Sequence, residues 1–256
     1  MSAVDVHAVV TGREDRPVVV LSNSLGSTHR MWDAQLAALE DRFRVVRYDT
    51  RGHGDSPVPD GPYSIDDLTD DVVVLLDRLG IARAHVVGLS LGGMTAMRLA
   101  ARNPERVDRV VLLCTAAQLP PATGWLERAA TVRANGSAAV AAAVVQRWFT
   151  PEYLGIHQEV RVAHERMVAA TPAEGYAGCC EAIAKLDLRE DISSITAPTL
   201  GIAGQDDPAT PPARLEEIAA SIPGARLLVV PGSAHLANAE QPGSVTPAII
   251  EHLEQQ

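Results

Sequence analysis

A serine stands at the centre of the pattern Gly88-Leu89-Ser90-Leu91-Gly92. A run rich in β-branched residues precedes this pattern and a helix-forming run follows it, which is the strand–turn–helix context of a nucleophile elbow. Such a turn strains the backbone of Ser90, and the two glycines leave out side chains that would clash there. The pattern therefore predicts a nucleophilic hydroxyl raised above a sheet edge. The alternative is a glycine-rich turn with an idle serine.

A serine hydroxyl is a weak nucleophile and needs a general base. His235 is the strongest candidate among the eight histidines, because it follows the last predicted strand in a glycine-containing loop. The nearest rival is His53, whose flanking glycines indicate a structural turn. The base needs an acid to hold its tautomer. Asp206 and Asp207 both follow the penultimate strand, and one of them could instead serve a turn-forming Asp-Pro.

These groups should meet because the carboxyl ends of parallel strands share one edge of the sheet, where open α/β sheets bind ligands. Hydrolysis also needs two backbone N–H donors for the developing oxyanion, each worth roughly 2.7–4 kcal/mol. Leu91 N–H follows the nucleophile at a helix N-terminus. Leu25 N–H lies in the loop at residues 22–27, where Gly26 allows a turn, although a plain Ser/Asn/Gly loop would look the same. No metal-ligand spacing is seen, so we expect neither a metal nor a cofactor.

The elements that must position these residues follow a β-α rhythm. Short apolar runs predict strands at residues 17–22, 43–48, 84–87, 107–114, 197–203 and 225–230. Helical patterns lie between several of them, at residues 31–39, 65–79, 91–101 and 212–221. Ser64, three residues before Asp67, indicates an N-cap for the second helix. The rhythm predicts an α/β fold with a mostly parallel, doubly wound sheet.

Residues 121–185 break this rhythm. They contain no clear strand but several alanine-rich helical patterns, including 136–149 and 158–169. We interpret them as a helical cap inserted into a core formed by residues 1–120 and 186–256. Six basic and six acidic residues balance within the insertion, so the net charge of −10 falls on the core.

Bulk properties exclude several classes of protein. At 46% apolar and 21% charged residues, the composition is that of a globular protein. The net charge of −10 argues against nucleic acid or an anionic membrane as partner. We find no signal-peptide pattern and no apolar span long enough for a membrane helix. The three cysteines have neither zinc spacing nor a disulfide framework, so we expect a reduced, cytoplasmic protein. The sequence leaves the oligomeric state open.

The chain resembles the α/β-hydrolase fold over nearly its whole length. The supporting segments are the elbow, residues 48–56 (YDTRGHGDS), 207–211 (DPATP) and 232–235 (GSAH). Within that fold it resembles the 3-oxoadipate enol-lactonases, through residues 23–26 (NSLG), 147–151 (RWFTP), 178–183 (GCCEAI) and 187–189 (DLR). The resemblance implies Ser90 as nucleophile, His235 as base and Asp207 as acid.

The resemblance also implies a substrate: a small lactone with a free carboxylate, opened to 3-oxoadipate in protocatechuate degradation. An acidic protein must supply a local cation to bind such a substrate. The candidates lie in the insertion: Arg128, Arg133 and Arg147, with Trp125 and Trp148 as apolar walls. Each arginine could instead be a solvated helix residue, and each tryptophan could be core.

Other functions on the same fold remain open. The triad would equally suit a carboxylesterase, a cofactor-free haloperoxidase-like perhydrolase or a carbon–carbon bond hydrolase, because fold does not determine chemistry. A ligand receptor that has lost turnover is a further alternative, against which the intact elbow and triad argue.

Overall fold

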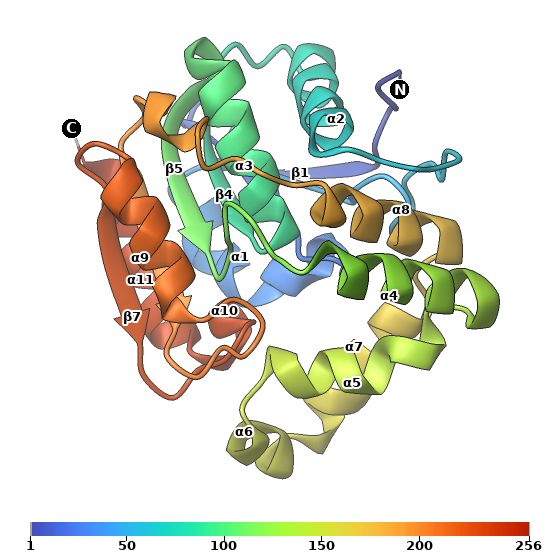
Figure 1. The fold of residues 1–256 in the computed structure, drawn as a ribbon. Coiled ribbons are helices and arrows are strands. Elements are labelled where there is room, and N and C mark those ends of the chain that lie inside the picture. The colour runs from blue at the N-terminus through green and yellow to red at the C-terminus, as the bar shows by residue number, and fades with distance from the viewer. Residues whose placement is uncertain (1, 256) are drawn as a thin grey trace.

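The computed structural model describes residues 2–255. Its centre is a seven-stranded sheet with the order β1-β3-β2-β4-β5-β6-β7 (Figure 1). The strands are β1 Ala8–Gly12, β2 Val18–Ser22, β3 Arg44–Tyr48, β4 Ala84–Leu89, β5 Val107–Leu113, β6 Thr199–Gly204 and β7 Arg226–Val230. β1 pairs antiparallel with β3, and every other pair of neighbours is parallel. The predicted mostly parallel, doubly wound sheet is confirmed.

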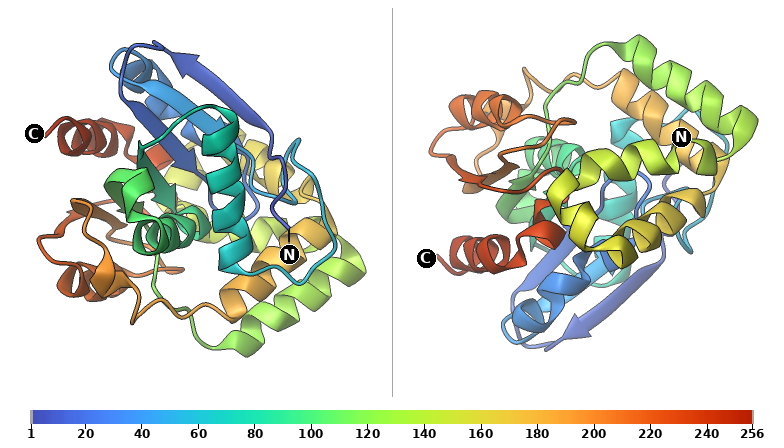
Figure 2. Two further views of the ribbon diagram at one scale, coloured as in Figure 1. Left: turned by 90° about the horizontal axis from the view of Figure 1, so that it is seen from above. Right: turned by 90° about the horizontal axis from the view of Figure 1, so that it is seen from below.

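Helices pack on the sheet (Figure 2): four of them lie between successive strands in the chain, and two follow the last strand. They are α1 Asp33–Glu40, α2 Ile65–Arg78, α3 Leu91–Arg102, α9 Pro212–Ser221, α10 Ala237–Glu240 and α11 Pro242–Glu254. Three short 3₁₀ helices accompany them: η1 His29–Trp32, η2 Pro104–Arg106 and η3 Ile192–Ser194. The predicted cap of α2 is present as a capping box. The Ser64 hydroxyl accepts the Asp67 N–H, and the Asp67 carboxylate accepts the Ser64 N–H.

The central strands are apolar because both of their faces are covered. All six residues of β4 are buried, as are the last four of β2 and β3. A strand buried on both faces reads as a continuous apolar run rather than an alternating one. This burial gives the strand ends a rigid base, and the site is built on those ends.

Five helices are inserted between β5 and β6. They are α4 Ala122–Asn135, α5 Ala138–Trp148, α6 Pro151–Ile156, α7 Gln158–Ala169 and α8 Ala173–Ala184. α4 packs on α8, and α5 packs on α7 (Figure 1). α8 also touches the core directly, because a Cβ at Gly175 would lie 2.0 Å from the carbonyl oxygen of Gly52. We keep the division into core and cap as our interpretation of these elements.

The sequence did not predict β1. Its five residues form the antiparallel edge of the sheet, where none is fully buried, so they lack a clear apolar pattern. No helix in the described part of the chain is long and apolar enough to cross a membrane.

Candidate active site

Ser90 lies between β4 and α3 with a positive φ of 57°. That conformation is strained for a residue with a side chain. It is allowed here because glycines flank it: a Cβ at Gly88 would lie 2.2 Å from the Gly92 carbonyl oxygen, and a Cβ at Gly92 would lie 2.2 Å from the Ser22 carbonyl oxygen. Both clashes involve backbone atoms that have no room to move. The glycines therefore play the part that the sequence pattern predicts for them.

The structure brings His235 and Asp207 together. His235 Nδ1 lies 2.8 Å from Asp207 Oδ2, and both side chains are buried. The other carboxylate oxygen, Oδ1, accepts the N–H groups of Ala209 and Thr210 at 2.7 and 3.0 Å. Burial raises the pKa of Asp207, but the charge of His235 and the hydrogen bonds from His235 and Thr210 outweigh it, so the net shift is downward. The carboxylate is thus held ionised.

Asp206 turns the other way. Its residue is exposed, and its N–H donates to the Ser233 carbonyl oxygen at 2.9 Å. With Asp207 accepting at Nδ1, the imidazole of His235 keeps its Nε2 free. His235 and Ser90 line the same cavity.

Two backbone N–H groups are available as oxyanion donors. Leu25 and Leu91 are both buried, and in the described part of the chain neither N–H donates to another protein group. Buried N–H groups are rarely left unpaired. Leu91 begins the twelve-residue helix α3, whose N-terminus favours negative charge. Leu25 lines the cavity together with Ser90.

His53 has a structural role: it holds the loop at residues 22–27, which contains Leu25. Its Nε2 accepts the Gly26 N–H at 2.9 Å, so Nδ1 carries the proton and faces the Arg51 carbonyl oxygen at 3.2 Å. Burial lowers the pKa of His53 to about 4, which keeps the ring neutral near pH 7. His53 therefore positions the loop that carries Leu25. Both of its ring nitrogens are engaged, so it is not a candidate for the general base.

The cavity has a volume of about 130 Å³ and lies between core and cap. The cap contributes Trp125, Arg128, Arg147 and Trp148, four of the five residues that the sequence indicates for substrate binding. The Arg128 guanidinium lies 4.6 Å from the centre of the Trp125 ring. Segments that follow core strands supply Ser90 and His235 to the lining, and the insertion supplies Trp125, Arg128, Arg147 and Trp148.

The two cavity arginines have no acidic partner within residues 2–255. Both are half-buried. Burial and the charge of Arg128 together lower the pKa of Arg147, so two like charges are held near each other and are partly removed from water. An anionic ligand would relieve both costs.

Comparison with known proteins identifies the family. A family model described as "alpha/beta hydrolase fold" matches residues 17–242. The chain belongs to the α/β-hydrolase fold family. It is 42% identical to 3-oxoadipate enol-lactonase 2 of Acinetobacter baylyi, over 93% of this chain and 89% of the relative. The crystal structure of the enol-lactonase from Burkholderia xenovorans LB400 matches with a TM-score of 0.96 and 43% identity, over 98% and 96% of the two chains.

A putative carbamate hydrolase, RutD of Caulobacter sp. strain K31, is 31% identical over 93% of this chain and 91% of the relative. The resemblance to the α/β-hydrolases and, within them, to the 3-oxoadipate enol-lactonases is therefore confirmed.

Arg133 does not belong to the cavity of this hydrolase, which corrects the expectation from sequence. Its guanidinium binds the carboxylates of Glu174 and Glu181 on α8, with Nε 2.8 Å from Glu174 Oε2. It lies five positions after Arg128 in the same helix, α4, which corresponds to a rotation of about 140° around the helix axis. The two side chains therefore cannot face the same wall.

Tyr176 is a cavity residue that sequence reasoning missed. It is fully buried in α8, lines the cavity, and its hydroxyl has no hydrogen-bond partner in the described structure. Its ring packs on the loop at residues 22–27, because a Cβ at Gly26 would lie 2.9 Å from Tyr176 Cε2. In the sequence, a tyrosine among glycine, alanine and cysteine looks like an ordinary core residue. Only its unpaired hydroxyl, which is seen in the structure, indicates a role in the cavity.

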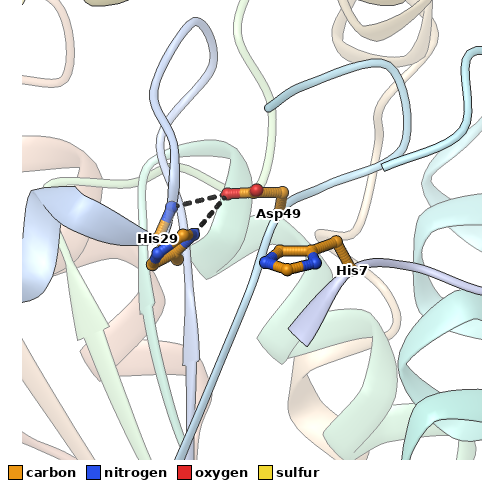
Figure 3. A group of neighbouring side chains, drawn as sticks. All are labelled: His7, His29 and Asp49. Carbon is orange, nitrogen blue, oxygen red and sulfur yellow. Dashed lines mark hydrogen bonds and ion pairs between the residues drawn. The ribbon is translucent and has the colours of Figure 1, made fainter. Parts of the chain in front are cut away.

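A second polar cluster lies near β1 and β3 (Figure 3). Ring nitrogens of His7 and His29 and a carboxylate oxygen of Asp49, atoms of the kind that bind metal ions, lie within 4.8 Å of one another. Asp49 Oδ1 accepts the His29 N–H at 2.8 Å and lies 3.0 Å from His29 Nδ1, while Oδ2 accepts the Asp55 N–H at 3.1 Å. Both carboxylate oxygens are therefore engaged: Oδ1 joins the chain after β3 to the chain after β2, and Oδ2 closes the loop after β3 on itself. We interpret the cluster as a loop anchor.

Proposed function

We propose that this hydrolase opens 3-oxoadipate enol-lactone to 3-oxoadipate through an acyl-enzyme, as a step of protocatechuate degradation in the cytoplasm. The observation that carries the proposal is one cavity lined by Ser90, by His235 with Asp207 behind it, and by two arginines that have no acidic partner among the described residues. Hydrolytic chemistry and anion recognition thus face the same small space. The names of the similar proteins from Acinetobacter and Burkholderia support this choice of substrate.

In the first half-reaction, His235 Nε2 takes the Ser90 proton while Oγ attacks the lactone carbonyl carbon. The Leu25 and Leu91 N–H groups hold the oxyanion of the tetrahedral intermediate. Its collapse breaks the ring C–O bond, and the enol oxygen leaves with the proton from His235. The enol then tautomerises to a ketone, which removes the nucleophile for the reverse reaction.

In the second half-reaction, His235 takes a proton from water, and the resulting nucleophile attacks the acyl carbon on Ser90. Collapse of this intermediate releases the second carboxylate of 3-oxoadipate and returns the proton to Ser90 Oγ. Asp207 accepts from Nδ1 throughout and stabilises the imidazolium that forms in each step.

The free carboxylate of the substrate binds to Arg128 and Arg147, and the Tyr176 hydroxyl supplies one further donor. Bonds of this kind, between a charged donor and a carboxylate, are stronger than those between neutral groups. Trp125 and Trp148 cover the apolar faces of the five-membered ring.

A second candidate is hydrolysis of a small carbamate, which the 31% identity to a putative carbamate hydrolase favours. The same nucleophile and base would serve that reaction. The two candidates differ in whether the substrate carries the carboxylate that the arginines would recognise.

The deciding experiment compares turnover of 3-oxoadipate enol-lactone with muconolactone, p-nitrophenyl acetate and a simple carbamate. We expect the enol-lactone to give the highest kcat/KM, and Ser90→Ala to lower its kcat by several orders of magnitude. A Ser90→Ala variant that kept most of its lactonase activity would refute the serine mechanism. Turnover of the acetate ester without turnover of the enol-lactone would favour the other hydrolases of this fold.

A further inference from the structure

The loop that carries His235 is joined to the cap on both sides of the histidine. Leu236 N–H, directly after it, donates to the Trp148 carbonyl oxygen at 2.8 Å. Ala234 N–H, directly before it, donates to Glu240 Oε2 at 2.8 Å. Trp148 ends cap helix α5 and lines the cavity. One residue therefore touches the space for the substrate with its side chain and holds the base loop with its carbonyl.

Glu240 completes a second connection between the same two parts. Its Oε1 accepts the Thr150 N–H at 3.0 Å and also the Thr150 hydroxyl. Thr150 links α5 to α6 in the cap, whereas Glu240 ends the short helix α10 of the core. Glu240 is 6% exposed, and no cation within residues 2–255 pairs with its carboxylate. A buried carboxylate held by three neutral donors is costly to build unless those bonds are all made.

We propose that Glu240 is a positioning residue that couples the cap to the base. Its carboxylate fixes the Ser233–Ala234 peptide, one residue before His235, relative to Thr150, and thereby relative to the cavity wall at Arg147 and Trp148. The imidazole of His235 and the substrate-binding wall are then held in a fixed position relative to each other. This role rests on the proposed function, in which His235 activates Ser90.

The opposite side of α10 offers a matched control. Gln35 Nε2 donates to the Asn238 carbonyl oxygen at 2.8 Å, and Asn238 Nδ2 donates to Gln35 Oε1 at 3.0 Å. These bonds hold the same short helix to α1 in the core and do not reach the cap. Gln35 is fully buried and is not a cavity residue. Gln35→Met therefore loosens α10 without breaking the connection through Glu240.

The test compares Glu240→Gln with Gln35→Met. A glutamine has a single acceptor oxygen and so must give up either the Ala234 donor or the Thr150 donors. The readouts are Tm, kcat and KM on p-nitrophenyl acetate, and the rate at which a fluorophosphonate probe labels Ser90. We expect Glu240→Gln to lower both kcat and the labelling rate by roughly 10- to 100-fold, with KM within about twofold, because small misplacements of a catalytic group have costs of this size. Gln35→Met should lower Tm at least as much and keep both rates within about twofold.

Equal rates in Glu240→Gln and the wild type would overturn the coupling, as would equal rate losses in the two variants. If Glu240→Gln does not fold, Thr150→Val serves instead, since it removes the hydroxyl and leaves the carboxylate in place. It should slow labelling of Ser90 by a few fold, and an unchanged rate would refute the proposal. A wild-type protein that the probe does not label at Ser90 would instead refute the serine mechanism itself, and the coupling with it.

Discussion

Removing the charge of Arg147 should weaken catalysis and strengthen the fold. The side chain is half-buried, lines the cavity and has no acidic partner within residues 2–255. Burial and the nearby charge of Arg128 both lower its pKa, so the folded protein holds this charge at a cost. Arg147→Met keeps the apolar stem and removes the cation. Proteins commonly retain such unfavourable groups where a ligand needs them.

The size of the catalytic effect follows from the bond that is lost. A hydrogen bond between a charged donor and a carboxylate is worth about 1.5–3 kcal/mol. At about 1.4 kcal/mol for each factor of ten, kcat/KM for the enol-lactone should fall about 10- to 150-fold. Most of the change should appear in KM, because the bond is made to a part of the substrate that does not react. Arg128 remains, so binding is weakened rather than abolished.

The stability effect has the opposite sign. Relief of about 1 kcal/mol would raise Tm by roughly 2–4 °C for a chain of this size. The assay pairs enol-lactone kinetics with p-nitrophenyl acetate kinetics and thermal unfolding. Arg133→Met is the control, because its guanidinium binds Glu174 and Glu181 outside the cavity. It should leave both kcat/KM values unchanged and give no gain in Tm.

A loss for Arg147→Met that was equal on the enol-lactone and on the neutral ester would refute the reasoning. The arginine would then support the shape of the cavity rather than recognise an anion. Unchanged kcat/KM on the enol-lactone would refute it as well.

Three further predictions concern the core of the site. Asp207→Asn should lower kcat by about 10⁴-fold, because an amide favours the wrong tautomer of the base, whereas Asp206→Asn should stay within about twofold in the same assay. Gly88→Ala should prevent formation of a folded, fluorophosphonate-reactive elbow, because its Cβ would lie 2.2 Å from the Gly92 carbonyl oxygen; a variant with wild-type Tm and labelling would contradict this. Burial lowers the pKa of His53 from 6.5 to about 4, so its neutral form stabilises the fold above pH 6.5, and that stability is lost as the pH falls to 4. Urea unfolding at pH 7 and pH 4 should show His53→Gln reducing this acid-induced loss by about 3 kcal/mol, and an identical loss in both proteins would refute the assignment.

The features that could be predicted from sequence are those that a local pattern specifies. The elbow is one, because glycines at 88 and 92 are needed by the turn itself. The central strands are another, since burial on both faces leaves an apolar run in the sequence. The meeting of His235 with an aspartate follows from the rule that parallel strands end at one edge. The resemblance to enol-lactonases adds the family to this.

The remaining features depend on which way a side chain faces. Asp206 and Asp207 are chemically equal, and only the turn after β6 decides which carboxylate reaches His235. Arg133 and Arg128 are both arginines in the predicted helical cap, so the sequence does not distinguish them. Arg133 lies on another face of α4, where it pairs with Glu174. Glu240 looks like a surface acid in a short helix, and its burial becomes visible only when the cap is in place. Such distinctions arise from tertiary packing and leave no periodic signal.

The core and the cap contribute different residues to the cavity, and this separation affects how the substrate preference of the enzyme could evolve. Its reactive atoms come from four separated points in the core, whereas the facing wall comes from one uninterrupted stretch of chain between β5 and β6. Recombination that exchanged this single stretch could alter substrate preference in one event, without disturbing the machinery beneath. Such a graft would have to preserve the Trp148 carbonyl and the N–H and hydroxyl of Thr150, because these groups make the bonds that join the cap to the loop of His235 and to Glu240.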